Sequence, residues 1–377
     1  MKKLSVALML ACLLAPASTR AQNAYITNQR SNTVSVIDTT TNTVSATIPV
    51  GVTPFGVAAS PNGSKVYVTN AFSNTVSVID TATNTVIATI PVGITPGCSP
   101  SPCTMSVAVS PDGSKVYVTN ASPNTVSVID AAINTVSATI PVSLTPVGVA
   151  VNPDGSKVYV ANVDAGTVSA IDTATNTVGA TISVGPRPFG VAVSPDGSKV
   201  YVTNSSAPNT VSVIDTATNT VSATIPVGIT PLGVAVSPDG SKVYVTSAFS
   251  NTAWVIDTAT NTVSATIPVG VTPVGVAINP DGSKVYVANL NANTVSVIDT
   301  TTNTVIATIP VSSQPVAFGV FMQPAPRFAG VAGSKNCQGT SVSALATKFG
   351  GLNAAAAALG FANVQGLQDA IRAFCRG

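Results

Sequence analysis

The sequence VYVTN at residues 200–204 is followed by NTVSVIDTATNTVSATIPVG at residues 209–228 and by TPLGVAVSPDGSK at residues 230–242. Variants of this phrase fill most of the chain. The seven tyrosines all belong to it, and they are Tyr25, Tyr67, Tyr117, Tyr159, Tyr201, Tyr244 and Tyr286. The steps between them are 42, 50, 42, 42, 43 and 42 residues. A period of this length indicates stacked supersecondary units.

One period predicts four strands, namely GVAVS, VYVTN, TVSVID and TVSATIPV. Each is rich in Val, Ile, Thr or Tyr, the residue types that suit a pleated and half-buried surface. The SPDGSK between the first two strands predicts a tight hairpin, because Pro, Asp and Gly each favour turn geometry. Four short antiparallel strands per repeat of about 40–50 residues are typical of a β-propeller blade.

The two ends of the repeat region favour a closed ring over the alternative, a β-solenoid. The first repeat begins at Tyr25 in its second strand and lacks a GVAVS strand, whereas an extra strand, VAFGVFMQ, follows the seventh repeat at Val316 to Gln323. Pairing this strand with the N-terminal blade removes the open sheet edges. We therefore predict an all-β fold, a seven-bladed β-propeller of four-stranded antiparallel blades over residues 22–324.

The motifs VYVTN, NTVSVID and PVGVAVSPDGSK resemble the YVTN family of β-propeller repeats, which occurs in secreted and surface proteins of bacteria and archaea. The resemblance covers roughly Asn23 to Pro324. It implies the propeller fold but no particular activity, because propellers host many unrelated functions.

The N-terminus predicts export. Residues 1–21 combine two lysines, an apolar run of about 12 residues and small residues before Gln22, a pattern typical of a secretory signal peptide. A lipoprotein signal ending at Cys12 is the alternative. We expect no transmembrane span, because the apolar run is too short for one, and a periplasmic, secreted or cell-surface location.

The composition argues against nucleic acid as a partner. The formal net charge is +2, and removal of Lys2, Lys3 and Arg20 with the signal leaves 13 basic against 14 acidic residues. Recognition of nucleic acid needs a clustered basic excess.

The four cysteines outside the signal predict disulfides, because an even number in an exported chain favours pairing. Local pairing gives Cys98–Cys103, across the insertion in the 50-residue step, and Cys337–Cys375. Metal binding is the disfavoured alternative, because neither pair has CxxC spacing. We expect residues 325–336 to be a linker and residues 337–377 to be a small helical tail closed by the second disulfide.

The absence of His and Glu from the chain excludes a Ser-His-Asp triad and histidine metal sites. It also weakens the analogy with seven-bladed lactonases and with haem or quinone propellers. Asp ends the third strand of every repeat. A cation-binding ring is possible in principle, but we favour capping of the following turn. We expect the lysine of each SPDGSK to be solvated.

Candidate binding residues lie where the repeats differ. The loops that lead into the first strand and the loops that join the second and third strands share one face of a propeller. Phe55, Phe189 and Phe318 would form a hydrophobic ring for a ligand or, as we favour, plug the channel. Trp254 would be a binding anchor or would pack between blades. The candidate ligand-binding residues are Arg30, Phe55, Phe72, Asp164, Arg187, Phe189, Phe249, Trp254 and Phe318.

From the sequence we predict an exported, monomeric, non-catalytic scaffold. It would bind a protein or a cell-envelope glycan on its variable loops and would need no cofactor or metal. The alternative is a lactonase-like hydrolase that uses Asp164 and Arg187.

Overall fold

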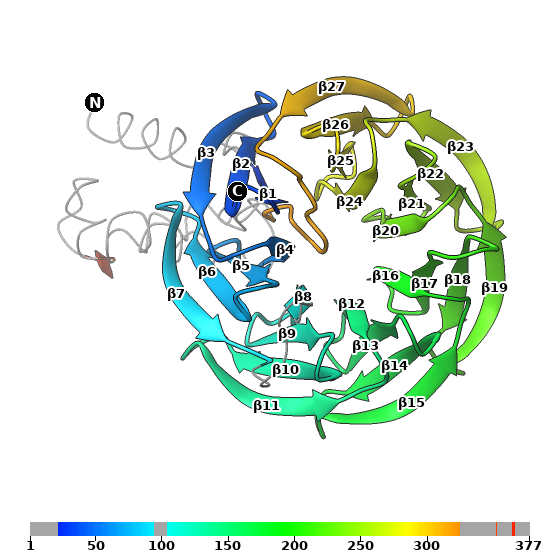
Figure 1. Ribbon diagram of the computed structural model, residues 1–377, viewed down its shortest axis with the longest axis horizontal. Helices are drawn as coiled ribbons and strands as arrows, with labels where there is room; N and C mark the ends of the chain where they lie inside the picture. The colour runs from blue at the N-terminus through cyan, green and yellow to red at the C-terminus, as the bar shows by residue number, and fades with distance from the viewer. Residues whose placement is uncertain (1–21, 94–103, 325–351, 353–363, 366–377) are drawn as a thin grey trace. The chain divides into compact units, whose positions relative to one another are not determined.

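The computed structural model describes residues 22–93, 104–324, 352 and 364–365. Gln22–Pro324 form one compact unit, in which short antiparallel strands are arranged as blades around a common axis (Figure 1). Blades 2 to 7 are four-stranded sheets, and their strands follow chain order from the axis to the rim. The predicted all-β, seven-bladed propeller is confirmed.

The strands are grouped by their place in the blade. The inner strands are β4 (Pro54–Ala59), β8 (Thr104–Val109), β12 (Pro146–Val151), β16 (Pro188–Val193), β20 (Pro231–Val236) and β24 (Pro273–Ile278). The second strands are β1 (Asn23–Asn28), β5 (Lys65–Asn70), β9 (Lys115–Asn120), β13 (Lys157–Asn162), β17 (Lys199–Asn204), β21 (Lys242–Ser247) and β25 (Lys284–Asn289). The third strands are β2 (Thr33–Asp38), β6 (Thr75–Asp80), β10 (Thr125–Asp130), β14 (Thr167–Asp172), β18 (Thr210–Asp215), β22 (Thr252–Asp257) and β26 (Thr294–Asp299). The outer strands are β3 (Thr43–Pro49), β7 (Thr85–Pro91), β11 (Thr135–Pro141), β15 (Thr177–Ser183), β19 (Thr220–Pro226), β23 (Thr262–Pro268) and β27 (Thr304–Pro310).

Blade 1 consists of β1, β2 and β3 and is completed by residues 315–323, which we name the closing segment. The N–H of Tyr25 donates to the carbonyl of Phe321 (3.0 Å), and the N–H of Val316 donates to the carbonyl of Thr27 (2.9 Å). Antiparallel bridges also join Ala24 to Met322 and Asn28 to Pro315. The predicted closure of the ring by the C-terminal end of the repeat region is therefore confirmed.

The closing segment is not the regular strand that we expected. Pro315 and Met322 pair with Asn28 and Ala24, whereas the equivalent residues of blade 2, Pro54 and Ala59, pair with Asn70 and Val66. The closing segment thus uses two more residues to cover the same length of partner strand.

The extra residues leave the blade and form a bulge toward the axis. Ala317 (φ 49°) and Gly319 (φ 111°) make this path possible, and the latter conformation suits glycine. The carbonyls of Phe318 and Val320 there accept hydrogen bonds from β4, at 2.7 Å from the N–H of Val57 and 3.0 Å from that of Ala59.

Several predictions fall on residues outside the described part of the chain. These are the signal peptide at residues 1–21, both disulfides and the linker at residues 325–336. In the predicted tail only Leu352, Val364 and Gln365 are described, and they are helical. Three residues are too few to support the predicted helical segment. Within the described part, no helix is long and apolar enough to cross a membrane.

The repeated tyrosines lie in the apolar layers between blades, and each is at most 2% exposed. They pack against Val and Ile side chains of the second and third strands, as Tyr201 packs against Val243 and Val245 of the next blade. Burial raises the pKa of Tyr25, Tyr244 and Tyr286 to about 12, because the phenolate would lose its hydration.

A buried threonine bridges neighbouring blades. The Thr203 hydroxyl of β17 accepts a hydrogen bond from the N–H of Gly190 in its own blade and donates to the carbonyl of Leu232 in the next, both at 2.8 Å. The same pair of bonds, at 2.6–2.9 Å, is made by Thr27, Thr69, Thr119 and Thr246. Blades 4 and 7 have Ala161 and Ala288 in this position.

The repeated aspartates cap their own turns, as we favoured. Seven carboxylates at the ends of the third strands accept the N–H of the residue two positions later, at 2.8–3.1 Å. In the PDG turn, Asp112 accepts the Ser110 hydroxyl (2.6 Å) and the Ser114 N–H (3.0 Å). These bonds lower the pKa of Asp112, and equivalent bonds lower those of Asp196 and Asp239, in each case to about 2.

Our expectation of solvated lysines is wrong for at least four of them. Their ammonium groups reach the turn of the next blade and donate to a backbone carbonyl there, at 2.9 Å from Lys65 to Ala131. The other three pairs are Lys157 with Thr216, Lys242 with Thr300 and Lys284 with Thr39, at 3.1–3.4 Å. The long alkyl chain lies along the blade and lets the charged end bond to the carbonyl.

The threonine bridge predicts a large effect for a small substitution. Thr203→Val keeps the shape but leaves the Gly190 N–H and the Leu232 carbonyl without their buried partner, so we expect a loss of about 1–3 kcal/mol in unfolding free energy. Chemical denaturation measures it. The exposed Thr224 of the same blade provides the control Thr224→Val, expected within about 0.5 kcal/mol of the wild type. Equal effects of the two substitutions would refute the bridge.

The turn carboxylates predict a dependence of stability on acid. Their pKa falls from 3.8 in the unfolded chain to about 2 in the fold. The stabilisation is therefore complete above pH 4 and is lost as the pH falls toward 2. Asn62 forms the same turn, with its Oδ1 accepting from Ser60 and Ser64. The triple substitution Asp112→Asn, Asp196→Asn and Asp239→Asn should reduce the fall in melting temperature between pH 4 and pH 2. An unchanged fall would contradict this explanation.

Candidate functional site

The two faces of the ring differ in their loops. The variable face carries the loops that lead into the inner strands and the loops that join the second and third strands. The turn face carries the PDG turns and the turns between the third and outer strands. The turn-face loops are near-copies of one another, so a distinctive site is expected on the variable face or along the channel.

Three polar side chains from different loops meet on the variable face between blades 4 and 5. The Arg187 guanidinium (Nη1), in the loop before β16, lies 3.6 Å from Oδ1 of Asp164, in the loop after β13. The Thr145 hydroxyl, in the loop before β12, donates to the other oxygen of Asp164 at 2.6 Å. The Arg187 and Asp164 side chains are 59% and 51% exposed, so the cluster is open to solvent. Arg187 and Asp164, both predicted as site residues, are thus brought together with a third polar group.

The local backbone explains why this cluster departs from the other blades. The residue before the inner-strand proline has a positive φ in Thr53, Thr145, Thr230 and Thr272, and likewise in Arg187 (51°). In other blades the side-chain oxygen of an asparagine accepts a hydrogen bond from the N–H of this residue, as Asn124 does for Thr145 (2.8 Å). Blade 4 has Gly166 in place of this asparagine, and glycine offers no side-chain oxygen.

Arg30 does not join this cluster. It is exposed in the loop between β1 and β2, and blade 1 lies across the ring from blades 4 and 5 (Figure 1).

Three of the predicted aromatic residues fill the axis near the variable face. The rings of Phe55 and Phe318 are stacked, with centroids 5.1 Å apart and planes 6° apart. The Phe189 ring is tilted by 54° against Phe318, also at 5.1 Å. Phe55 and Phe318 are buried in a cluster with Val274 and Val316. This packing supports our preference for a plug.

Phe72 and Phe249 are exposed, and they are two of six exposed large apolar residues described on the variable face. On the variable face their loops lie beside Val52 and Ile229, because the N–H of Phe72 donates to the carbonyl of Val52 and that of Phe249 to the carbonyl of Ile229, both at 3.3 Å. The exposed apolar residues of this face are Val52 (49%), Phe72 (48%), Leu144 (57%), Ile229 (56%), Phe249 (72%) and Val271 (51%).

Trp254 is half-buried and bonds within its own blade. Its indole N–H donates to the Thr252 hydroxyl (2.8 Å). In blade 5 the equivalent places hold Asn204 and Ser212, which bond to each other at 2.9 Å. Blade 6 has Ser247 for the asparagine and Trp254 for the serine, so the large indole takes the space that the smaller residue leaves.

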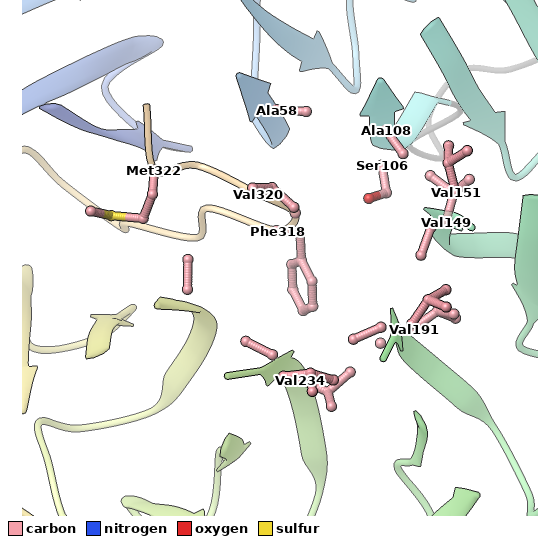
Figure 2. Close-up of a pocket in the computed structure, with 18 of the residues that line it drawn as sticks. Ala58, Ser106, Ala108, Val149, Val151, Val191, Val234, Phe318, Val320 and Met322 are labelled. Carbon is pink, nitrogen blue, oxygen red and sulfur yellow. The ribbon is translucent and has the colours of Figure 1, made fainter. Parts of the chain in front are cut away.

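A cavity of about 440 Å³ lies along the axis, between the inner strands (Figure 2). Phe318 and Val320 of the closing segment project into it, and the inner strands supply alanines, valines and glycines. This cavity was not predicted from the sequence. Pro315 and Pro324 are farther apart in the sequence than the equivalent prolines of blade 2, Pro54 and Pro61. This longer spacing was the signal in the sequence, because the extra residues form the bulge in the channel.

A second hollow, of about 330 Å³, lies on the turn face between blades 4 and 5. Its carboxylates, Asp154 and Asp196, already accept hydrogen bonds from serines of their own turns. Across the described ranges, no group of three or more His, Cys, Asp or Glu side chains could hold a metal ion.

Comparison with known proteins supports the fold and gives a first indication of family. The model of the family "Lactonase, 7-bladed beta-propeller" matches residues 24–182. A stretch of 39 residues is 64% identical to a PE-PGRS family protein of Mycobacterium tuberculosis, but it spans only 8% of that protein and 10% of this chain.

Two solved structures are similar over most of the propeller. Hydrazine synthase of Kuenenia stuttgartiensis aligns with a TM-score of 0.66 and 26% identity, over 73% of this chain and 92% of the other. A functionally unknown protein of Desulfotomaculum acetoxidans aligns with a TM-score of 0.67 and 20% identity, over 79% of this chain and all of the other (100%). The chain is therefore a seven-bladed β-propeller whose residues 24–182 are similar to the lactonase propellers.

Proposed function

We propose that this chain is an exported binding protein and that it holds a partner protein on its variable face. The observation that carries the proposal is the coincidence, on this one face, of six exposed apolar side chains with the Arg187–Asp164–Thr145 cluster. Exposed large apolar side chains of this kind are the anchors that protein interfaces bury. Binding energy at protein interfaces is concentrated in a few aromatic and arginine side chains.

The contrast between the two faces supports this choice. On the turn face, Asp and Ser side chains bond within their own turns, and lysines bond to the next blade. Their hydrogen-bonding capacity is largely used by the fold. On the variable face, Phe249 and Leu144 have no such structural role and remain 72% and 57% exposed.

A second candidate is a lactonase-like hydrolase, and the family match favours it. The matched residues 24–182 include Thr145 and Asp164, although not Arg187. In this reaction the Asp164 carboxylate would take a proton from water as the water adds to the lactone carbonyl. The Arg187 guanidinium would stabilise the developing oxyanion. The ring C–O bond then breaks, and the protonated Asp164 returns its proton to the departing alkoxide oxygen. The open position of the cluster is less suited to such chemistry than a closed pocket is.

The binding proposal predicts that Phe249→Ala combined with Arg187→Ala weakens partner binding by at least about 2 kcal/mol, or roughly 30-fold in Kd. The partner is first identified by affinity capture from the envelope and medium of the producing cells, and both forms are then titrated against it. The control is Ile133→Ala, which removes an apolar side chain of similar exposure (68%) from the turn face. Loss of binding in the control alone would place the site on the other face. If only a glycan binds, the proposal of a partner protein is wrong.

The hydrolase candidate predicts turnover that depends on Asp164. Asp164→Asn keeps the bond from Thr145 but removes the base, so hydrolysis of a panel of simple lactones should fall by about 100-fold or more. Release of acid at constant pH measures the rate. The matched control is Asp281→Asn in a PDG turn. No hydrolysis by the wild type, or equal rates in both variants, would rule out this candidate.

A further inference from the structure

The channel cavity has one closed end and a wall of uniform chemistry. The plug of Phe55, Phe189 and Phe318 lies near the variable face, and prolines of the PDG turns, such as Pro238 and Pro280, line the other end. Ser106 provides the one side-chain hydroxyl among the lining residues. The side chains of the wall are otherwise apolar and uncharged.

The backbone adds polar groups to this apolar wall. Each inner strand pairs with only one neighbour within its sheet, because it is the first strand of the blade. In antiparallel pairs, alternate residues direct their N–H and C=O groups away from the partner strand. The outward groups of the inner strands therefore face the axis, where they need hydrogen-bonding partners.

The closing segment shows how one of these edges is used. The N–H groups of Val57 and Ala59 in β4 donate to the carbonyls of Phe318 and Val320, at 2.7 and 3.0 Å. Gly56 and Phe318 form a parallel bridge. A short segment with apolar side chains, bent at Gly319, thus bonds to an inner strand from within the channel.

The same register is repeated in blades 4, 5 and 6. Val57 and Ala59 pair with Val68 and Val66 of the second strand. The equivalent pairs of β12, β16 and β20 are Val149 with Val160, Val151 with Val158, Val191 with Val202, Val193 with Val200, Val234 with Val245 and Val236 with Val243. By this equivalence, two N–H groups of each strand face the cavity. All six valines line it.

We propose that the channel is a binding site for a short, extended peptide with apolar side chains. The carbonyls of the peptide accept hydrogen bonds from the free edge of β12, β16 or β20, as the carbonyls of Phe318 and Val320 do from β4. Recognition then combines main-chain hydrogen bonds with burial of small apolar side chains, as in other cases of strand addition. The cavity is about three times the roughly 150 Å³ cavity that accepts benzene, so it holds two or three small residues.

Val320 offers a way to close this site without disturbing the core. It lines the cavity and is 66% exposed, so a larger side chain can be placed there at little cost to packing. Val320→Trp should obstruct the cavity. Val52→Trp places the same side chain at a position of similar exposure (49%) on the variable face and is the matched control.

The test is titration calorimetry of the full chain with the blocked tripeptide N-acetyl-Val-Ala-Val-amide. A second peptide has the same sequence with methylated backbone nitrogens, which cannot donate to a strand edge. We expect saturable binding of the first peptide, at least 10-fold weaker binding of the methylated one, and at least 10-fold weaker binding to Val320→Trp. Val52→Trp and Arg187→Ala should bind as the wild type does, which separates this site from the variable face.

Three results would overturn the proposal. The first is no saturable binding by the wild type at millimolar peptide, which would leave water as the partner of the strand edges. The second is equal affinity for the two peptides, which would mean that the peptide N–H groups make no bonds to a strand edge. The third is unchanged binding by Val320→Trp, provided that its melting temperature matches that of the wild type.

Discussion

In five of the seven blades, the bridge made by one buried threonine hydroxyl sets the registry with the next blade. Apolar packing between Tyr, Val and Ile side chains is strong but has little directional preference, so it does not define how one sheet lies on the next. A hydroxyl that accepts from Gly190 and donates to Leu232 does so, because both bonds must be made at once. The repeat has glycine beside this bridge for the same reason. A Cβ at Gly190 would lie 2.3 Å from the Leu232 carbonyl, and a Cβ at Gly233 would lie 2.3 Å from that of Val274. The threonine of the second strand and the glycine of the inner strand therefore take part in the same contact.

Much of the fold could be predicted because the same strand and turn motifs recur in successive repeats. The period predicts the number of blades, and VYVTN at residues 200–204 coincides with β17 at Lys199–Asn204. Turn capping by Asp215 or Asp112 is a local interaction, so the surrounding residues are enough to predict it. The lysines show the limit of this reasoning, since Lys65 bonds to Ala131, 66 residues away in the next blade.

The candidate site was predicted only in part, because its residues come from loops that are far apart in the sequence. Arg187 and Asp164 could be singled out as rare charges in variable loops, but their approach to within 3.6 Å depends on the contact between two blades. Thr145 was missed because it has the same identity as the equivalent residue of most blades, and only its contact with Asp164 distinguishes it. Trp254 was ambiguous because its space is created by Ser247, a substitution in another strand. The channel cavity depends on the path of the closing segment, which two additional residues redirect.

Ring closure imposes an order on the assembly of the molecule. The N–H of Ala317 donates to the Thr27 hydroxyl across 290 positions of sequence, whereas the same bond in blade 2, from Gly56 to Thr69, spans 13. Closing the longer loop costs about 2–3 kcal/mol more by the logarithmic law for flexible chains. Blades 2 to 7 each consist of contiguous sequence and can form as the chain emerges from the ribosome. Blade 1 can be completed only after the last residues of the repeat region have been synthesised. Until then the inner edge of β1 is exposed. The incomplete ring is therefore most prone to incorrect strand pairing at β1, the first strand to be synthesised.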